Sequence, residues 1–327
     1  MRRAATVAIL VVIISGMIVG HPAFAHNFVQ NSDAATIAKV QEFDVEAKLI
    51  ASNISNNTLA QWHISKSQGY WGSNEIGILS QKDSNLATQI STAIDDLYSM
   101  AGQQNANPTT ASQQANTISQ LLNQAESEEV SSASQNNATV QALATVYVIN
   151  EVLKDYGDAI GSKVDLTNMN NMNMSGMSMG SSSGSSMQGM SGMSSSGSSM
   201  QGMSGMSSSG TVPATPIVDM GAYQSAQAMT DTAQTMFNNL KSIAPSSTSV
   251  YLNKVGSALT ELKQKIDAQA SGDDVMMVVH MNIHPNLISA FNIAAVPEFP
   301  MPMLLIVMSL VGVIVVSRTI AKKQILG

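Results

Sequence analysis

Residues 138–160, ATVQALATVYVINEVLKDYGDAI, carry a strong apolar pattern. The apolar side chains recur at steps of three, four or seven residues, at Leu143, Val146, Ile149, Leu153 and Ile160. An α-helix has about 3.6 residues per turn, so this spacing places them on one face. The same spacing recurs on both sides of the stretch, and it predicts an all-α protein made of antiparallel helical bundle segments.

The pattern divides the chain into two helical segments. Residues 26–166 are expected to form four or five helices, with loops near 105–108 and 135–137. Residues 213–293 are expected to form three, with a break at Ala244-Pro245 and a last helix that runs from about Asp273 toward His284, where Pro285 should disturb it. Residues 167–212 form a Met/Ser/Gly-rich linker, which we expect to be disordered.

The composition excludes several kinds of site. Cysteine is absent, which rules out disulfides, thiolate metal centres, iron–sulfur clusters and cysteine catalysis. Aromatic residues make up only 4% of the chain, so its cores should be small and aliphatic. The formal net charge is −7, and clustered Lys and Arg occur only at the two ends. We therefore expect cations, and no nucleic acid, as partners.

Both ends of the chain have features of membrane targeting. Residues 1–25 have a basic start, an apolar run and the small-x-small step Ala23-Phe24-Ala25, which predict a cleaved secretory signal peptide. Near the other end, residues 301–317 are uncharged and are followed by Arg318, Lys322 and Lys323. This order predicts a short transmembrane helix with a cytoplasmic basic tail, and an ectodomain outside the membrane.

The C-terminal region also contains a short motif. Pro297-Glu298-Phe299-Pro300 precedes the apolar run, so residues 297–327 combine Pro-Glu-Phe, one apolar helix and a basic tail. This order resembles the PEF-type sorting signal of archaeal cell-surface proteins. The resemblance implies processing by an archaeosortase-type membrane protease and attachment to the cell surface. Alternatively, these residues are a simple membrane anchor entered through a turn.

The linker carries the clearest chemical signal. Residues 181–193, SSSGSSMQGMSGM, are repeated without change as residues 194–206, and each copy contains M-x-x-M-x-x-M. Eleven methionines fall within 38 residues: Met169, Met172, Met174, Met177, Met179, Met187, Met190, Met193, Met200, Met203 and Met206. Thioether sulfur is a soft, uncharged ligand that suits Cu(I) better than hard cations.

The linker resembles the Met-rich segments of extracytoplasmic copper-resistance and copper-carrier proteins. That resemblance implies binding of Cu(I) as a cofactor or cargo through these methionines. Two alternatives stay open. The linker could be a flexible spacer in which methionine is incidental, or a sacrificial sink for oxidants.

A second candidate site lies in the C-terminal segment. His280 and His284 are four residues apart, so on a helix both imidazoles project from one face, and Met277 and Met281 are expected on nearly the same face. The four residues would form a His/Met copper site. The alternative is a histidine pair on a bundle surface with methionines in the core. A histidine brace between His26, at the expected mature N-terminus, and His63 is a weaker candidate.

These signals predict a surface-anchored, non-enzymatic protein that buffers or delivers Cu(I) outside the membrane. Copper-dependent surface proteins are possible partners, and motifs for a catalytic serine, a phosphate loop or a zinc protease are absent. The alternative is a structural or adhesive surface glycoprotein without a metal function. It is compatible with N-x-Ser/Thr sequons at Asn53, Asn56, Asn137 and Asn173.

Overall fold

The structure is a computed structural model that describes residues 26–28, 30–103, 105–169 and 214–297. The described part is mainly helical, which confirms the all-α prediction. It contains the long helices α2 (Ser32–Ser52), α3 (Asn57–Ser67), α4 (Ser73–Lys82), α5 (Ser84–Ala101), α6 (Pro108–Glu129), α8 (Ala138–Ala159), α9 (Met220–Ile243) and α10 (Ser249–Asp267). Shorter elements are α7 (Ser132–Gln135), η3 (Ser246–Thr248), α11 (Gly272–Met277), the π-helix η4 (Val278–Ile283) and α12 (His284–Phe291).

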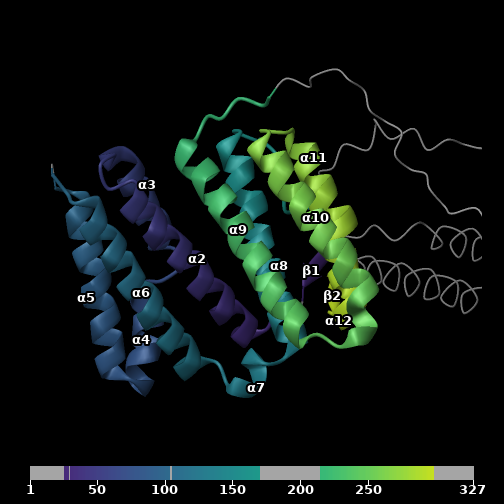
Figure 1. Cartoon of the computed structure of the whole chain (residues 1–327), viewed down its shortest axis with the longest axis horizontal. Helices are drawn as coiled ribbons and strands as arrows, with labels where there is room; N and C mark the ends of the chain where they lie inside the picture. Colours follow the sequence, from purple (N-terminus) through teal and green to yellow (C-terminus); the bar gives the residue numbers. More distant parts are fainter. Residues whose placement is uncertain (1–25, 29, 104, 170–213, 298–327) are drawn as a thin grey trace, which may run out of the picture.

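The helices stack side by side along the longest axis of the molecule (Figure 1). Helices α4, α5 and α6 form one end, α2 and α3 follow, α8 and α9 lie next to them, and α10 with α11, η4 and α12 forms the other end. The N-terminal segment holds more helices than the four or five expected, because Asp83 separates α4 from α5 and Ser131 starts the additional short helix α7. Both residues accept hydrogen bonds from the first backbone N–H groups of the helix that follows.

Helix α8 is the central helix. The side chains of Val146, Ile149 and Leu153 are fully buried, so the apolar stripe does form a core face. Helix α9 packs along α8, and the backbone N–H of Val218 donates to the carbonyl of Ala159 at 2.8 Å. The residues on either side of the linker therefore share one contiguous hydrophobic core.

Two strands that the periodicity did not predict join the ends of the described chain. β1 (His26–Phe28) pairs with β2 (Ala295–Pro297) in antiparallel orientation, with His26 opposite Pro297 and Phe28 opposite Ala295. Phe28 packs into the core, at 9% exposure. Hydrogen-bonding partners so far apart in sequence leave no trace in local periodicity.

The last helix differs from expectation around Pro285. The helix does not stop there: η4 leads directly into α12, in whose first turn Pro285 lies. In the wide π turn the N–H of His284 donates to the carbonyl of Val279, five residues back. Proline lacks an N–H and is tolerated in a first helical turn, so Pro285 fits into the start of the α-helix that follows the π-helix.

No helix of the described ranges is both long and apolar enough to cross a bilayer. The predicted signal peptide, residues 1–25, most of the predicted sorting motif, residues 298–300, and the apolar run of residues 301–317 all lie outside the described residues.

Candidate functional site

The histidine pair lies inside the protein, on the face of η4 and α12 that is turned to the core. His280 and His284 are 2% and 1% exposed. Their ring centroids are 5.3 Å apart and the ring planes meet at 81°, and Phe28 packs edge-on against His284 with a centroid distance of 5.1 Å. The alternative of a pair on the bundle surface is therefore wrong.

The hydrogen bond of His280 determines which of its ring nitrogens carries a proton. Nε2 lies 3.0 Å from the carbonyl oxygen of Leu166, and because a carbonyl can only accept, Nε2 must be the protonated nitrogen. Nδ1 then carries the lone pair. It is buried and makes no hydrogen bond within the described structure. Burial lowers the pKa of His280, against the opposing effects of the Leu166 hydrogen bond and the Asp165 carboxylate, so the ring is neutral near pH 7.

This arrangement is typical of metal-binding histidines. Such residues usually donate the second ring N–H to a carbonyl or carboxylate, which fixes the tautomer and aims the lone pair. A π-helix often marks a functional position as well. However, no group of three or more His, Asp or Glu suited to a metal ion exists among the described residues. An ion held here would have two imidazoles as its nitrogen ligands.

The structure does not place the predicted methionines beside the histidines. Met281 is 42% exposed and Met277 is half-buried, so the expected common face is wrong for Met281. Met281 directly follows His280, and successive residues of a helix are turned about 100° from one another, so the side that buries His280 and His284 leaves Met281 toward solvent. Met169 is half-buried against the core. The other ten linker methionines lie outside the described residues.

The fully buried His63 belongs to a different arrangement, a polar network between α2, α3 and α9. Its Nδ1 lies 2.7 Å from Glu46 Oε2 and its Nε2 lies 3.0 Å from Gln224 Oε1. Ser225 donates to the other oxygen of Glu46 at 2.7 Å, and Asn53 donates to Gln224 at 2.9 Å. Both ring nitrogens are engaged with side-chain oxygens, so neither is available for a histidine brace.

A second buried network adjoins the first, between α2, α3 and α8. Lys66 pairs with Glu151 at 2.6 Å and with Asp155, and the hydroxyl of Tyr70 donates to Glu151 at 2.5 Å. Burial alone would lower the pKa of Lys66, but the two carboxylates raise it above its usual value. The pKa of Glu151 is lowered by Lys66 in spite of burial.

Two carboxyl groups of this region, Asp155 and Glu42, have a raised pKa, although Asp155 shares Lys66 with Glu151. Burial raises the pKa of Asp155 to about 8 and that of Glu42 to about 8, with repulsion from neighbouring carboxylates adding to the effect. Both groups are therefore mostly protonated at neutral pH. Lys66 then forms its ion pair chiefly with Glu151, so this second network carries little net charge.

Sequence reasoning missed both networks, although a signal was present. Glu42 and Glu46 are four residues apart, and so are Glu151 and Asp155. Each pair interrupts an apolar stripe on the inner side of its helix, where carboxylates are rarely buried without a partner. Acidic pairs four residues apart on two apolar helix faces therefore pointed to a buried charged cluster.

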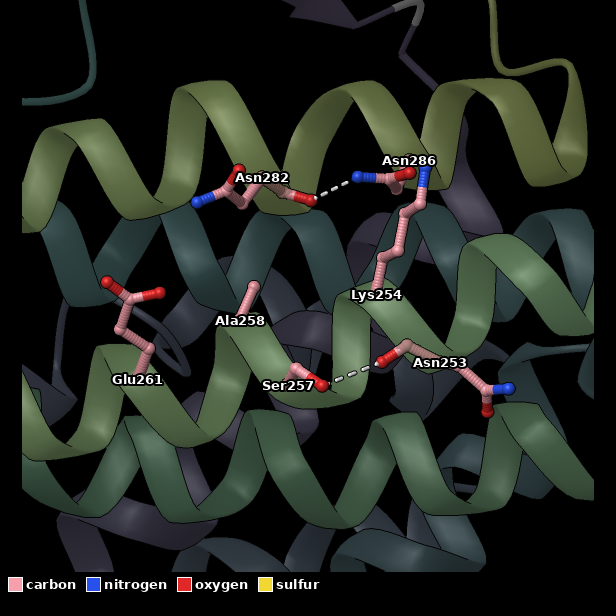
Figure 2. Close-up of a pocket in the computed structure, with 7 residues that line it drawn as sticks. All are labelled: Asn253, Lys254, Ser257, Ala258, Glu261, Asn282 and Asn286. Atoms are coloured by element: carbon pink, nitrogen blue, oxygen red, sulfur yellow. Dashed lines mark hydrogen bonds between the residues drawn. The ribbon is translucent and has the colours of Figure 1, made fainter. Parts of the chain in front are cut away.

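A polar groove of about 420 Å³ separates α10 from η4 and α12, on the side of η4 opposite the histidines. Figure 2 shows Asn282 and Asn286 above Lys254, Ser257 and Asn253. Asn286 donates to the carbonyl of Asn282 at 2.7 Å and Ser257 to that of Asn253 at 3.2 Å, each within its own stretch of helix. The groove is solvated, and it offers amide and hydroxyl groups without a buried charge.

Comparison with protein-family models, with curated proteins and with solved structures found no match.

Proposed function

We propose that this chain is an extracytoplasmic, surface-anchored Cu(I)-binding protein, in which the linker methionines capture the ion and the His280/His284 pair holds it. The protein would buffer copper or pass it on, without catalysing a reaction of its own. The observation that carries the proposal is the buried lone pair of His280 Nδ1, held in place by the hydrogen bond to Leu166. The surface location rests on the sequence features of the two ends.

The surroundings of the pair favour a monovalent soft ion. A metal ion moved from water into an apolar interior loses hydration energy, and the loss rises steeply with its charge. Two neutral imidazoles do not compensate the charge of a divalent ion, which in such a site usually has carboxylate or thiolate ligands. Cu(I) has a single charge and accepts imidazole and thioether ligands, so it fits this pair better than Zn²⁺.

The residue that fixes His280 comes just before the linker in the sequence. Leu166, whose carbonyl accepts from His280, is 2% exposed, and Met169 follows three residues later, half-buried against the core. The first methionine of the cluster thus follows closely, in sequence, the residue that holds the histidine.

An anaerobic Cu(I) competition titration against a chromogenic chelator tests the proposal on the full-length chain. One variant replaces all eleven linker methionines by serine, and a second is His280→Phe, which keeps an apolar ring of similar size. Met281→Ser is the matched control, because Met281 is exposed. We expect several bound ions in the wild type and the control, few in the linker variant, and loss of the tightest site in His280→Phe.

Negligible binding by the wild type would remove the copper function and leave a structural or adhesive surface protein. Equal binding by the wild type and the linker variant would remove the role of the methionines. Circular dichroism of every variant shows whether the helices are intact, so that a loss of binding is not mistaken for a loss of fold.

A further inference from the structure

A groove of about 780 Å³ runs along the first turns of α2, beside Tyr147 of α8. Its apolar wall consists of Ala35 and Ala38, and Glu42 lies at the end farthest from the start of the helix. α2 and α8 pack against one another along this stretch, close to the centre of the molecule (Figure 1). The groove therefore connects solvent with the edge of the buried charged region.

The carboxyl group of Glu42 is the unusual feature of this groove. It belongs to a residue that is only 8% exposed, yet it makes no hydrogen bond within the described part of the chain. The charged groups that act on it from α8 are Glu151 and Asp155, which repel it, and the half-exposed Lys154. Lys66 of α3 attracts it but is already paired with the two α8 carboxylates.

The remaining charged groups nearby do not neutralise Glu42 either. Lys39 lines the groove, and its ammonium group pairs with Glu75 of α4 at 2.7 Å. Glu46, one turn along α2, is paired with His63 at 2.7 Å. Glu42 is thus an acid in excess of the buried cations, and it reaches the groove. An acid in this position is neutralised either by a proton or by a cation that enters from solvent.

We propose that this groove binds a small primary alkylammonium ion, whose charged group pairs with Glu42 and whose alkyl chain lies against Ala35 and Ala38. The proposal is independent of the copper function, because none of these residues belongs to the histidine pair or the linker.

The shape and chemistry of the groove favour an organic ammonium over a metal ion. The volume is far larger than a bare ion requires, and no set of three or more His, Asp or Glu suited to a metal occurs in the described ranges. An ammonium group needs hydrogen-bond acceptors, and the two carboxylate oxygens of Glu42 border the groove. A protonated amine with a short alkyl chain can pair with the carboxylate and also lie against the apolar wall of the groove.

The pH dependence of binding separates this proposal from general adsorption. The amine competes with the proton on Glu42, whose pKa is raised to about 8 by burial, whereas an alkylamine keeps its own proton up to a pH of about 10. The deprotonated fraction of Glu42 rises roughly 90-fold between pH 6 and pH 9, and the affinity should rise by the same factor.

The experiment is isothermal titration calorimetry of the full-length chain with n-butylammonium chloride at pH 6 and pH 9, at constant ionic strength. 1-Butanol is the neutral probe of the same length. Glu42→Gln removes the charge with almost no change of shape, and Asp96→Asn, at an exposed position of α5, is the matched control. We expect binding at pH 9 in the wild type and Asp96→Asn, and its loss in Glu42→Gln.

Three results would overturn the proposal: no butylammonium binding at pH 9, equal binding by Glu42→Gln, or an affinity for 1-butanol that matches that for butylammonium. The pH series on the wild type gives a second, independent measurement, since it requires no substitution.

Discussion

The substitution Glu42→Gln should change how the stability of the protein depends on pH. The pKa of Glu42 is about 8 in the folded chain, against 4.5 for the ordinary side chain. Between these two values the unfolded chain has released the proton while the folded chain retains it, so stability falls as the pH rises and levels off above pH 8. Integrated from pH 5 to pH 9, this effect amounts to about 4 kcal/mol. Glutamine does not titrate and lacks this contribution.

Urea denaturation at pH 5, 7 and 9, followed by far-UV circular dichroism, measures the effect. Urea is uncharged, so it leaves the electrostatic interactions in place. The free energy of unfolding of the wild type, minus that of Glu42→Gln, should become more negative by about 4 kcal/mol from pH 5 to pH 9. The titrations of Asp155 and Glu151 occur in both proteins and largely cancel in the difference. Parallel curves for the two proteins would refute the inference that Glu42 is buried and protonated.

Two further substitutions test the packing between the helices. Lys66→Met leaves Glu151 and Asp155 buried without a cation. In urea denaturation we therefore expect the free energy of unfolding to fall by about 3–5 kcal/mol at pH 8 and by less at pH 5. An unchanged stability at pH 8 would contradict the assigned ion pairs. Gly221→Ala places a methyl group 2.7 Å from Cγ of Trp62, so we expect a loss of about 1–3 kcal/mol and a shifted tryptophan emission. Gly77→Ala, where a methyl group meets nothing within 4 Å, should instead stabilise its helix by up to about 1 kcal/mol. If both glycine variants gained stability, the contact between α3 and α9 would be wrong.

The helices could be predicted from the sequence because their cores are made of small apolar side chains at regular spacing. Leu240, Leu252 and Leu262, for example, follow that spacing and are buried. The residue at which each helix starts was less predictable. Helix α2 is capped by Asn31, whose side chain accepts from the N–H of Ala34, whereas Ser32 or Asp33 would also have satisfied the preference for a polar cap. All three residues are favourable N-cap residues, so the sequence did not decide which of them starts the helix.

The candidate sites were predictable only in part. That His280 and His284 form a pair followed from their spacing, but their burial depends on Phe28 and Leu166, which come from distant parts of the chain. The exposure of Met281 depends on which side of the helix faces the core, and the spacing of the four residues did not show that the histidines occupy the buried side. His63 was a weak candidate for a brace with His26, and tertiary contacts that the sequence does not reveal enclose it completely.

The pairing of β1 with β2 sets the order in which this chain can finish folding. His26 pairs with Pro297, so the first described residue depends on one of the last. A chain that leaves the ribosome or crosses a membrane N-terminus first exposes β1 long before its partner exists. Closing so long a loop is slow, and its entropic cost is offset by the strand contacts only when both ends are present. The enclosure of His284 by Phe28 is therefore among the last events of folding, and a nascent chain has no complete histidine pocket until residue 297 has emerged.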